Sequence, residues 1–468
     1  MSFTPSHQHD LPRPQDDGSQ IPFDRREYRR VLISSYIGTA VEYYDFLLYA
    51  AAASLIFGEL FFSGLSPLAG TVAALGTLAA GYLSRPIGGV VFGHIGDRIG
   101  RKKTLTMTMI LMGVATSLIG LLPTSAQIGG FAPVLLILLR IVQGIGVGGE
   151  WGGATTMCYE HARPGRRAFA ASVVNAGMPA GTALAAVLLG LFSLLPDEQF
   201  LSWGWRIPFL LSSVLVFVGL WMRLRISESP LFVEAQKKEA ESEARGEDRT
   251  APILQVLRRP GMLIAALCTG LAPFALNAFV NTFGLVWASE NGGLSSTQTL
   301  TAQACGAFVN IFTALTAGYL ADRIGHKPIM MFGIIGAALF AYPFLLLLGS
   351  GSLGAAIVGN VVAVVFIASF FAPLPSFISG LFPTSTRYTG AGLGYQLAST
   401  LAGGFSPMIF SALLAAGGGT DPRYVLMFIA VAAVLGVTAV VRVRKPLPEQ
   451  ETGAERTLVT GPVPSSTG

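Results

Sequence analysis

The chain of 468 residues contains few charged residues. Only 12% of its residues are Asp, Glu, Lys or Arg, whereas 52% are hydrophobic. A soluble domain usually carries about 25% charged residues. A chain of this composition lacks the polar residues to cover a soluble surface, so the composition predicts that lipid is its main solvent. The charges are also clustered, since residues 1–30 and 223–259 hold 25 of the 57.

Cysteine and histidine are scarce as well. The three cysteines, Cys158, Cys268 and Cys305, lie in apolar blocks, which argues against a disulfide framework. The five histidines, at positions 7, 9, 94, 161 and 326, have no metal-site spacing. The sequence also lacks a recognisable nucleophile, catalytic triad or phosphate loop. We therefore expect no metal and no cofactor, and an integral-membrane enzyme or a receptor is disfavoured.

Long apolar stretches fill most of the chain. A helix needs roughly 20 apolar residues to cross the hydrocarbon core, and barrel strands would be shorter and alternate in polarity. The sequence predicts an all-α membrane protein with twelve spans. These are 31–57, 68–92, 105–122, 131–158, 168–192, 206–224, 262–288, 300–320, 328–348, 354–380, 389–415 and 424–442.

The basic residues indicate the orientation. With twelve spans, 27 of the 31 Lys and Arg residues fall in the two tails and in the joints on one side. Basic residues stay in the cytoplasm, so we expect polar cytoplasmic tails at 1–30 and 443–468 and a cytoplasmic linker at 225–261. This distribution accounts for the basic pI without nucleic acid. The linker divides the chain into two six-helix bundles, 31–224 and 262–442.

A charged decapeptide occurs once in each half. Residues 93–102 read GHIGDRIGRK and residues 318–327 read GYLADRIGHK. Each copy follows the second span of its half, and two related halves around a midplane site are a common design of carriers. The positive-inside rule explains the basic residues but not the repeated Asp. We therefore predict a cytoplasmic latch formed by Asp97, Arg98, Arg101, Lys102, Asp322, Arg323 and Lys327, in which a basic side chain or a helix N-terminus holds each Asp.

Charged residues inside predicted spans are expensive, and they mark functional sites by default. Glu42 and Asp45 lie on one face of the first span, and Arg140 lies in the fourth. Counting 1.5 Å per residue places Glu42 and Arg140 at similar depths, so we expect them to meet near the midplane. Two carboxylates against one Arg favour a proton-binding role, although a purely structural ion pair is the alternative.

For the other polar residues within spans, the sequence gives less support to a functional role. Arg85 and Glu150 fall near the predicted cytoplasmic ends of spans two and four, where snorkelling or the latch accounts for them. A second group either lines a cavity or ties helices together: Tyr43, Gln143, Asn175, Asn277, Asn281 and Gln396.

The segment Gly144–Gly149 fits the G-x-G-x-x-G dinucleotide pattern. It lies inside a long apolar block and lacks the acidic residue expected about 20 positions later. The four-residue spacing of Gly144, Gly148 and Gly152 instead predicts close helix packing in lipid.

These motifs together resemble the major facilitator superfamily, and in particular its metabolite:H+ symporter branch. The resemblance rests on the doubled G-x-x-x-D-R-x-G-x-K joint and on RIVQGIG at 140–146. It also rests on GTAVEYYDFLLYA (38–50), GGEWGGA (148–154), SWGWRIPFL (202–210) and LFPTSTRYTGAGLGYQ (381–396). The branch includes shikimate, oxoglutarate and proline/betaine carriers. The resemblance implies that Glu42, Asp45 and Arg140 couple transport to protons.

The expected function is therefore secondary active import of a small organic acid, such as shikimate or a dicarboxylate, with protons and by alternating access. The alternative is a proline- or betaine-type zwitterion symporter. A long coiled-coil tail, typical of osmosensing betaine carriers, does not follow the last span. We expect a multi-pass protein of the plasma membrane that contacts lipid, works as a monomer and uses the proton as its coupling ion.

Overall fold

The computed structural model of this protein describes residues 24–163, 165–244 and 251–443. Every regular element in these ranges is a helix, in agreement with the predicted all-α class. Most of both predicted tails and the centre of the predicted linker lie outside the described residues.

The described residues of the first half, 24–163 and 165–224, form nine helices and one π-helical turn. They are α1 (Arg25–Leu55), α2 (Phe57–Phe61), α3 (Pro67–Ile99), α4 (Arg101–Leu121), α5 (Ser125–Ile128), α6 (Phe131–His161), α7 (Arg167–Phe192), α8 (Asp197–Gln199), η1 (Phe200–Gly204) and α9 (Arg206–Leu224). The predicted linker contains α10 (Pro230–Ala244) and α11 (Pro252–Arg258).

The second half has the same character. Its helical elements are α12 (Pro260–Ala278), η2 (Phe279–Phe283), α13 (Gly284–Glu290), α14 (Ser296–Ile324), α15 (His326–Gly349), α16 (Leu353–Phe371), α17 (Leu374–Ser379), η3 (Thr384–Thr386), α18 (Arg387–Ala398), η4 (Ser399–Gly404), α19 (Ser406–Ala416) and α20 (Arg423–Arg442). The π-turns η2 and η4 interrupt the helices predicted at 262–288 and 389–415, a local geometry that often occurs at functional sites.

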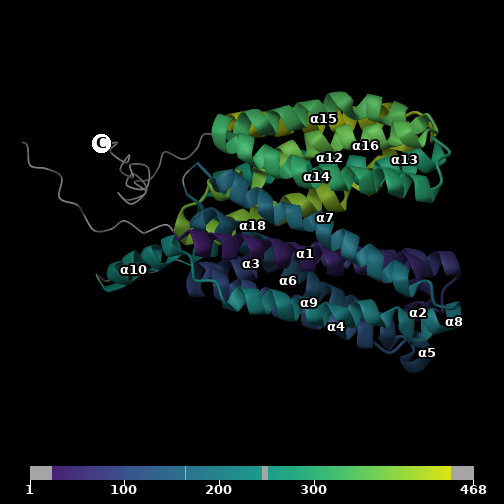
Figure 1. Cartoon of the computed structure of the whole chain (residues 1–468), viewed down its shortest axis with the longest axis horizontal. Coiled ribbons are helices and arrows are strands. Elements are labelled where there is room, and N and C mark those ends of the chain that lie inside the picture. Colours follow the sequence, from purple (N-terminus) through teal and green to yellow (C-terminus); the bar gives the residue numbers. More distant parts are fainter. Residues whose placement is uncertain (1–23, 164, 245–250, 444–468) are drawn as a thin grey trace, which may run out of the picture.

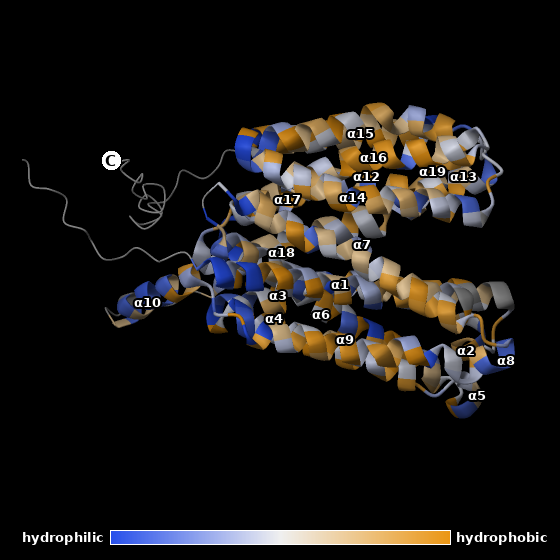
Figure 2. Cartoon of the chain, in the orientation of Figure 1, coloured by the Kyte–Doolittle hydropathy of each residue, from blue (hydrophilic) through white to orange (hydrophobic). Residues whose placement is uncertain are grey.

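Ten helical segments of the described chain are long and apolar enough to cross a membrane. Helices α1 and α3 are not among the ten, although they are 31 and 33 residues long. Both lie alongside the other long helices (Figure 1). Both also carry charged residues near their middle, Glu42 and Asp45 in α1 and Arg85 in α3. The long sides of the molecule are mostly hydrophobic and one end is hydrophilic (Figure 2), as expected when lipid surrounds the long sides.

The helices pack into two groups with separate hydrophobic cores. In Figure 1, α1, α3, α4, α6 and α9 lie below, and α12, α14, α15 and α16 lie above. One large cluster of buried apolar side chains draws its members from residues 44–209, and the other draws on 256–443 together with Trp151. The groups meet where α7 packs on α14 and where α18 packs on α3 and α6.

Close packing of α3 on α6 confirms the interpretation of the glycine pattern. An added Cβ at Gly144 would lie 2.3 Å from the Gly81 carbonyl oxygen, and one at Gly148 would lie 2.0 Å from that of Arg85. Only glycine permits this approach. The dinucleotide pattern lies within the uninterrupted helix α6, so it does not form a strand-to-helix turn.

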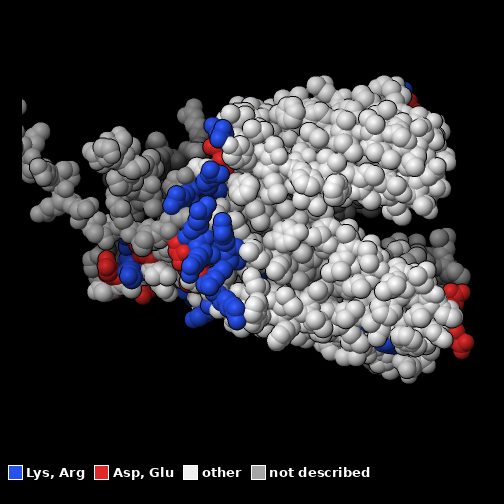
Figure 3. Space-filling model, viewed as in Figure 1, with Lys and Arg blue, Asp and Glu red and all other residues white. Residues whose placement is uncertain are grey.

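Most Lys and Arg residues visible in Figure 3 gather at one end of the molecule, called here the basic end. Its defining residues lie in the last turns of α3 and α14 or shortly after α3, α6 and α14: Arg98, Arg101, Lys102, Lys103, Arg163, Arg166, Arg323 and Lys327. Between the two groups of helices, Figure 3 also shows the surface hollowed at the opposite end.

Candidate functional site

A closed hydrogen-bond network surrounds Asp45 inside the first group of helices. Its carboxylate accepts hydrogen bonds from the hydroxyls of Thr116 (2.9 Å) and Ser212 (2.5 Å). The Gln143 amide donates to Thr116 (2.8 Å), and the Arg140 guanidinium donates to Gln143. Asp45 and Arg140 are only 1% and 3% exposed, so this network is buried among the helices.

Glu42 has a different environment. It is buried, and the strongest attractive charge acting on it is Arg85 of α3. Within the described residues, no cation lies within ion-pair distance of its carboxylate. The Arg85 guanidinium packs over the rings of Tyr82 (4.2 Å to the centroid) and Phe46 (5.0 Å). These ring contacts use its faces and leave its N–H edges available.

Arg85 is a half-buried guanidinium without a carboxylate partner among the described residues. It lies 18 residues from the first residue of α3 and 14 from the last, about 27 and 21 Å along the helix. An unpaired cation near the centre of an apolar structure is costly unless an anion or water reaches it. Arg85 is therefore suited to receive the anionic group of a ligand.

Aromatic side chains from both halves surround this pair. Tyr395 of α18 stacks on Trp151 of α6 with ring centroids 3.3 Å apart, and Phe274 of α12 meets Tyr395 edge-on at 4.9 Å. The charges of Tyr43, Glu42, Arg85 and Tyr82 act on Tyr395. The candidate site thus lies between the halves, with its charges from one half and aromatic walls from both.

Three buried polar atoms near the interface between the halves have no hydrogen-bond partner within the described chain. They are Trp151 Nε1, Asn175 Oδ1 and Gln396 Oε1. Asn175 and Gln396 each use their other amide atom to bridge the halves, from Asn175 Nδ2 to the Phe371 carbonyl (2.8 Å) and from Gln396 Nε2 to the Gly148 carbonyl (3.4 Å). Buried polar atoms are nearly always satisfied, so these three are places for water or a ligand.

The expected contact between Glu42 and Arg140 does not occur in the structure. Arg140 instead packs over Tyr49 (4.2 Å) and reaches Asp45 through Gln143 and Thr116. Equal depth along two helices was the basis of the expectation, but depth does not fix the direction in which each side chain points. Asp45, rather than Glu42, shares a network with Arg140.

Arg85, one of the two residues expected near the cytoplasmic ends of spans, lies deeper than predicted. The span containing Arg85 was predicted to end at residue 92, but α3 continues to Ile99, which moves Arg85 to the middle of the helix. Glu150 pairs inside the first group with Arg223, whose guanidinium donates two hydrogen bonds to it, and Thr108 adds a third (2.9 Å). Arg223 had been counted with the basic residues of the tails and joints, although it lies within α9.

The remaining polar candidates were predicted either to line a cavity or to tie helices together. Gln143, Asn175 and Gln396 tie helices together as described above. Asn281 donates to the side chain of Asn277 (2.8 Å), and Asn281 is exposed. Tyr43 is half-buried beside Glu42. The sequence analysis missed Tyr82, Trp151 and Tyr395; aromatic residues in the middle of predicted spans were the available signal.

At the basic end, Asp97 joins the two halves. Its carboxylate accepts hydrogen bonds from the backbone N–H groups of Tyr388 (3.2 Å) and Thr389 (2.9 Å), at the N-terminus of α18. The Thr389 hydroxyl donates as well (2.7 Å), and Arg101 lies at 3.3 Å. An anion at a helix N-terminus satisfies free N–H groups and the helix dipole. We call this contact the first latch.

Asp322 repeats the arrangement from the other half. It accepts hydrogen bonds from the backbone N–H groups of Ala168 (2.8 Å) and Phe169 (2.9 Å), at the N-terminus of α7. In both copies the acid contacts the second and third residues of a helix in the opposite half. The repeated Asp, which the positive-inside rule did not explain, thus has a matching contact in each half. We call this contact the second latch.

The two lysines of the repeat act within their own halves. Gly100 (φ +110°) and Gly325 (φ +99°) end α3 and α14 in backbone conformations that favour glycine. Lys102 Nζ then donates to the Leu224 carbonyl (2.9 Å), and Lys327 Nζ donates to the Val443 carbonyl (2.6 Å). Arg98 and Arg323 are exposed, and Arg323 packs over the Tyr319 ring.

A buried charge cluster that the sequence analysis missed strengthens the first latch. Glu160 of α6 lies 3.3 Å from Arg101 and 3.2 Å from Arg387, which belongs to the second half. Ser229, just before α10, donates a hydrogen bond to the same carboxylate. Glu160 falls just past the predicted end of its span and Arg387 in a short joint, so neither stood out as an intramembrane charge.

We predict that Asp97→Asn opens the basic end and slows transport. The substitution removes an anion held by a helix N-terminus, a contact worth up to about 2 kcal/mol in buried geometry, or roughly a thirtyfold shift in population. Spin labels at Lys103 and Arg323 should move apart, and uptake should fall at unchanged protein level. Asp421→Asn, at the opposite end, serves as the matched control. Unchanged label distances and uptake in Asp97→Asn would contradict the latch.

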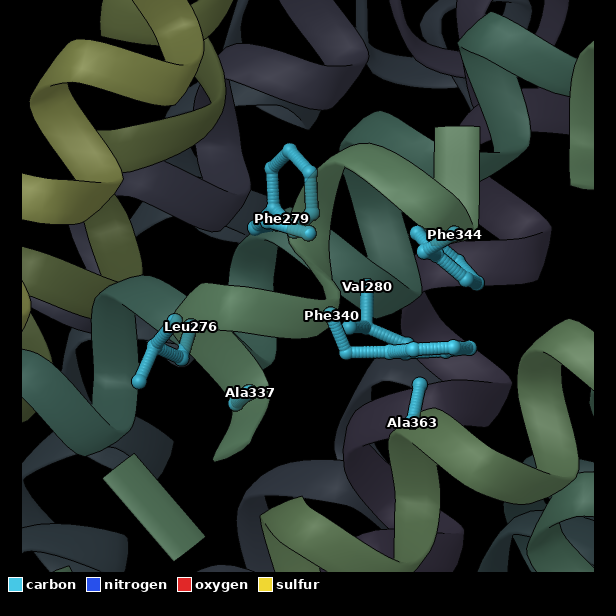
Figure 4. Close-up of a pocket in the computed structure, with 8 residues that line it drawn as sticks. Leu276, Phe279, Val280, Ala337, Phe340, Phe344 and Ala363 are labelled. Carbon is cyan, nitrogen blue, oxygen red and sulfur yellow. The ribbon is translucent and has the colours of Figure 1, made fainter. Parts of the chain in front are cut away.

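A small hollow inside the second group is unsuited to a polar ligand. It measures about 10 Å³ and is lined by apolar residues around η2: Leu276, Phe279, Val280, Ala337, Phe340, Ala341, Phe344 and Ala363 (Figure 4). This volume is at the lower limit for a single water, and no polar side chain lines it. In the described part of the chain, no cluster of His, Cys, Asp or Glu is arranged to hold a metal ion.

Comparison with known proteins identifies the family. The model of the Major Facilitator Superfamily matches residues 35–286 and 282–465. The chain is 39% identical over 398 residues to the shikimate transporter of Escherichia coli (strain K12), covering 82% of this chain and 88% of that protein. The chain therefore belongs to the Major Facilitator Superfamily. It is a multi-pass transporter of the inner membrane, and not an enzyme.

Two further comparisons bear on fold and substrate range. The chain is 32% identical over 427 residues to the glycine betaine/proline/ectoine/pipecolic acid transporter OusA of Dickeya dadantii (strain 3937), covering 88% of this chain and 83% of that one. Its fold resembles that of the proton:xylose symporter XylE, with a TM-score of 0.72 at 17% identity, over 91% of this chain and 97% of XylE.

Proposed function

We propose that this protein is a proton-coupled symporter that imports a small organic acid by alternating access. The single observation that carries the proposal is the Arg85 guanidinium, which lacks a carboxylate partner among the described residues and packs over Phe46, one helical turn from Glu42. Arg85 offers a planar fork suited to a carboxylate, and Glu42 is a carboxylate able to hold a proton. No other coupling ion or cofactor is needed for this arrangement, and one chain suffices.

Coupling follows from competition for Arg85. In the empty carrier, the Arg85 charge favours the ionised form of Glu42. A substrate carboxylate that binds the guanidinium neutralises this charge, and Glu42 then takes up a proton because its buried environment disfavours an isolated anion. Substrate and proton therefore enter together, and their binding affinities are linked reciprocally.

Asp45 and Arg140 take a supporting role in this proposal. The Asp45 carboxylate receives two hydroxyl donors, whereas Glu42 accepts no hydrogen bond within the described residues and Arg85 is the cation that acts on it most strongly. A group that exchanges protons with each transport cycle is better provided by a carboxylate that no hydroxyl donor holds in the ionised form. We therefore assign the proton to Glu42 and a helix-positioning role to the Asp45–Arg140 network.

The aromatic walls favour a compact ring or a short carbon skeleton as substrate. Tyr395, Trp151 and Phe274 offer flat apolar surfaces, and Trp151 Nε1 and Gln396 Oε1 offer an unused donor and acceptor for hydroxyl groups. Shikimate, a hydroxylated ring acid carried by one relative, has this chemistry. A proline- or betaine-type zwitterion is the second candidate, because the relatives include such transporters and Glu42 next to Arg85 presents both charges.

The experiment that tests the function is uptake by the purified full chain in proteoliposomes. Labelled shikimate, a dicarboxylate, proline and glycine betaine are offered under an inward proton gradient with the membrane potential clamped. We expect accumulation of an organic acid that collapses when a protonophore is added. Accumulation of only the zwitterions would favour the second candidate. Transport of any of the four that does not respond to the proton gradient would overturn the coupling.

The proposed topology has twelve spans, the ten apolar segments together with α1 and α3, and both termini are cytoplasmic. The basic end then faces the cytoplasm, as the positive-inside rule requires, and the hollow at the opposite end faces outward.

We predict that an impermeant thiol reagent added to intact cells labels Ser63→Cys, in the exposed joint between α2 and α3. The same reagent should label Gln236→Cys, on the exposed surface of α10, only after permeabilisation. The variants are made in a background without Cys158, Cys268 and Cys305, and that background alone is the control. Labelling of Gln236→Cys in sealed cells would refute the orientation.

A further inference from the structure

A groove at the basic end is separate from the proposed transport site. It lies between the turn that joins α3 to α4 and the linker helix α10, and its volume is about 610 Å³. Its lining combines cations with apolar side chains: Arg98, Ile99, Lys102, Lys103, Glu228, Phe232, Val233 and Gln236. We call it the α10 groove.

The charge of the α10 groove is positive and largely uncompensated. The one carboxylate, Glu228, already caps α4 by accepting hydrogen bonds from the backbone N–H groups of Arg101 (3.0 Å) and Lys102 (3.1 Å). Arg98 and Lys103 are exposed, and neither forms an ion pair within the described chain. Lys102 Nζ donates to the Leu224 carbonyl, and an ammonium group has two further donors.

An apolar stripe leads along α4 to these cations. Lys103 is followed at helical spacing by Met107, Ile110, Val114 and Leu118, which are 44%, 42%, 52% and 44% exposed. Inside the groove itself, Ile99 is 44% and Val233 40% exposed beside the charges. In a membrane protein such a stripe faces lipid tails, and its basic end lies at headgroup level.

We propose that the α10 groove binds the headgroup of an anionic phospholipid. Its phosphate would contact Arg98, Lys102 and Lys103, and its acyl chains would lie along the α4 stripe. A soluble phosphate would use only the cations and leave the stripe uncovered. A zwitterionic lipid would bring its own positive charge into a groove that has a surplus of it. Cationic pockets at a membrane surface favour anionic headgroups by about 1 kcal/mol per Lys or Arg.

A lipid in the α10 groove would also affect the first latch, because residues that line the groove contact Arg101. The lining residues Glu228 and Phe232 contact Arg101, the first at the backbone N–H and the second through its ring, 4.3 Å from the guanidinium. Arg101 is part of the first latch. A lipid that bridges α4 and α10 would therefore hold the linker against the latch. This inference does not depend on the substrate or on proton coupling.

The test measures lipid binding to the purified full chain in a neutral detergent by native mass spectrometry, with phosphatidylglycerol as the probe. Phosphatidylcholine tests whether acyl chains alone account for the binding. Soluble glycerol phosphate tests whether the phosphate alone accounts for it. Arg98→Gln/Lys103→Gln removes two groove cations, and Lys237→Gln/Lys238→Gln removes two exposed charges of α10 outside the groove as the matched control. All four positions are exposed, so the fold should tolerate the changes.

We expect phosphatidylglycerol to bind the unsubstituted protein more tightly than phosphatidylcholine does. The groove variant should lose about 25-fold in affinity for phosphatidylglycerol, about fivefold per cation, and its binding of phosphatidylcholine should be unchanged. The control variant should bind like the unsubstituted protein. Three results would overturn the proposal: equal losses in both double variants, no loss in the groove variant, or binding of glycerol phosphate as tight as that of the lipid.

Discussion

Glu42→Gln is expected to abolish accumulation of substrate against its gradient while leaving exchange intact. In proteoliposomes with an inward gradient of one pH unit and no membrane potential, coupling of one proton per substrate monoanion supports about tenfold accumulation. The variant should reach no accumulation, because the neutral amide cannot release and regain a proton. Exchange of external for internal substrate should persist, since Arg85 is untouched.

Asp45→Asn provides the comparison for this result. Its carboxylate is enclosed by Thr116 and Ser212 donors, so we expect this variant to accumulate substrate when correctly folded, although at a lower protein level. Counterflow exchange measured on the same vesicles separates loss of coupling from loss of folding. If Asp45→Asn uncouples transport and Glu42→Gln accumulates normally, the proton site is Asp45 and our assignment is wrong.

Arg85→Gln is expected to weaken substrate binding roughly 10- to 150-fold. A hydrogen bond to a charged group contributes about 1.5–3 kcal/mol, and the variant loses the fork that would hold the substrate carboxylate. Arg85→Lys should retain part of the affinity, because an ammonium keeps the charge but not the planar geometry. The measurement is substrate binding to purified protein, for example by tryptophan fluorescence or calorimetry.

Arg423→Gln is the matched control for Arg85, because it removes an exposed guanidinium at the opposite end of the molecule. It should leave binding unchanged. Arg140→Gln is the informative comparison, since the sequence alone favoured Arg140, and not Arg85, as the cation of the coupling site. A large loss of substrate affinity in Arg140→Gln, combined with normal affinity in Arg85→Gln, would return the binding role to Arg140.

The sequence by itself determined the class of protein and its repeat. Membrane spans are readable because hydrocarbon requires long apolar helices, and the basic residues cluster because they remain on one side. The doubled Asp97 and Asp322 pointed to two contacts between the halves, since a charge in an apolar chain is costly unless a partner holds it. The family follows from the same strings and was confirmed by comparison.

Only the tertiary structure decided which charges meet. Depth along a helix is a one-dimensional coordinate, whereas a contact also depends on rotation about the axis and on the helix that packs opposite. Arg140 therefore lies in the Asp45 network and Arg85 lies beside Glu42. Arg223 pairs with Glu150 inside the first group, and Glu160 joins Arg101 to Arg387 across the two halves. These pairings join residues 59 to 227 positions apart in the chain, which no local pattern specifies.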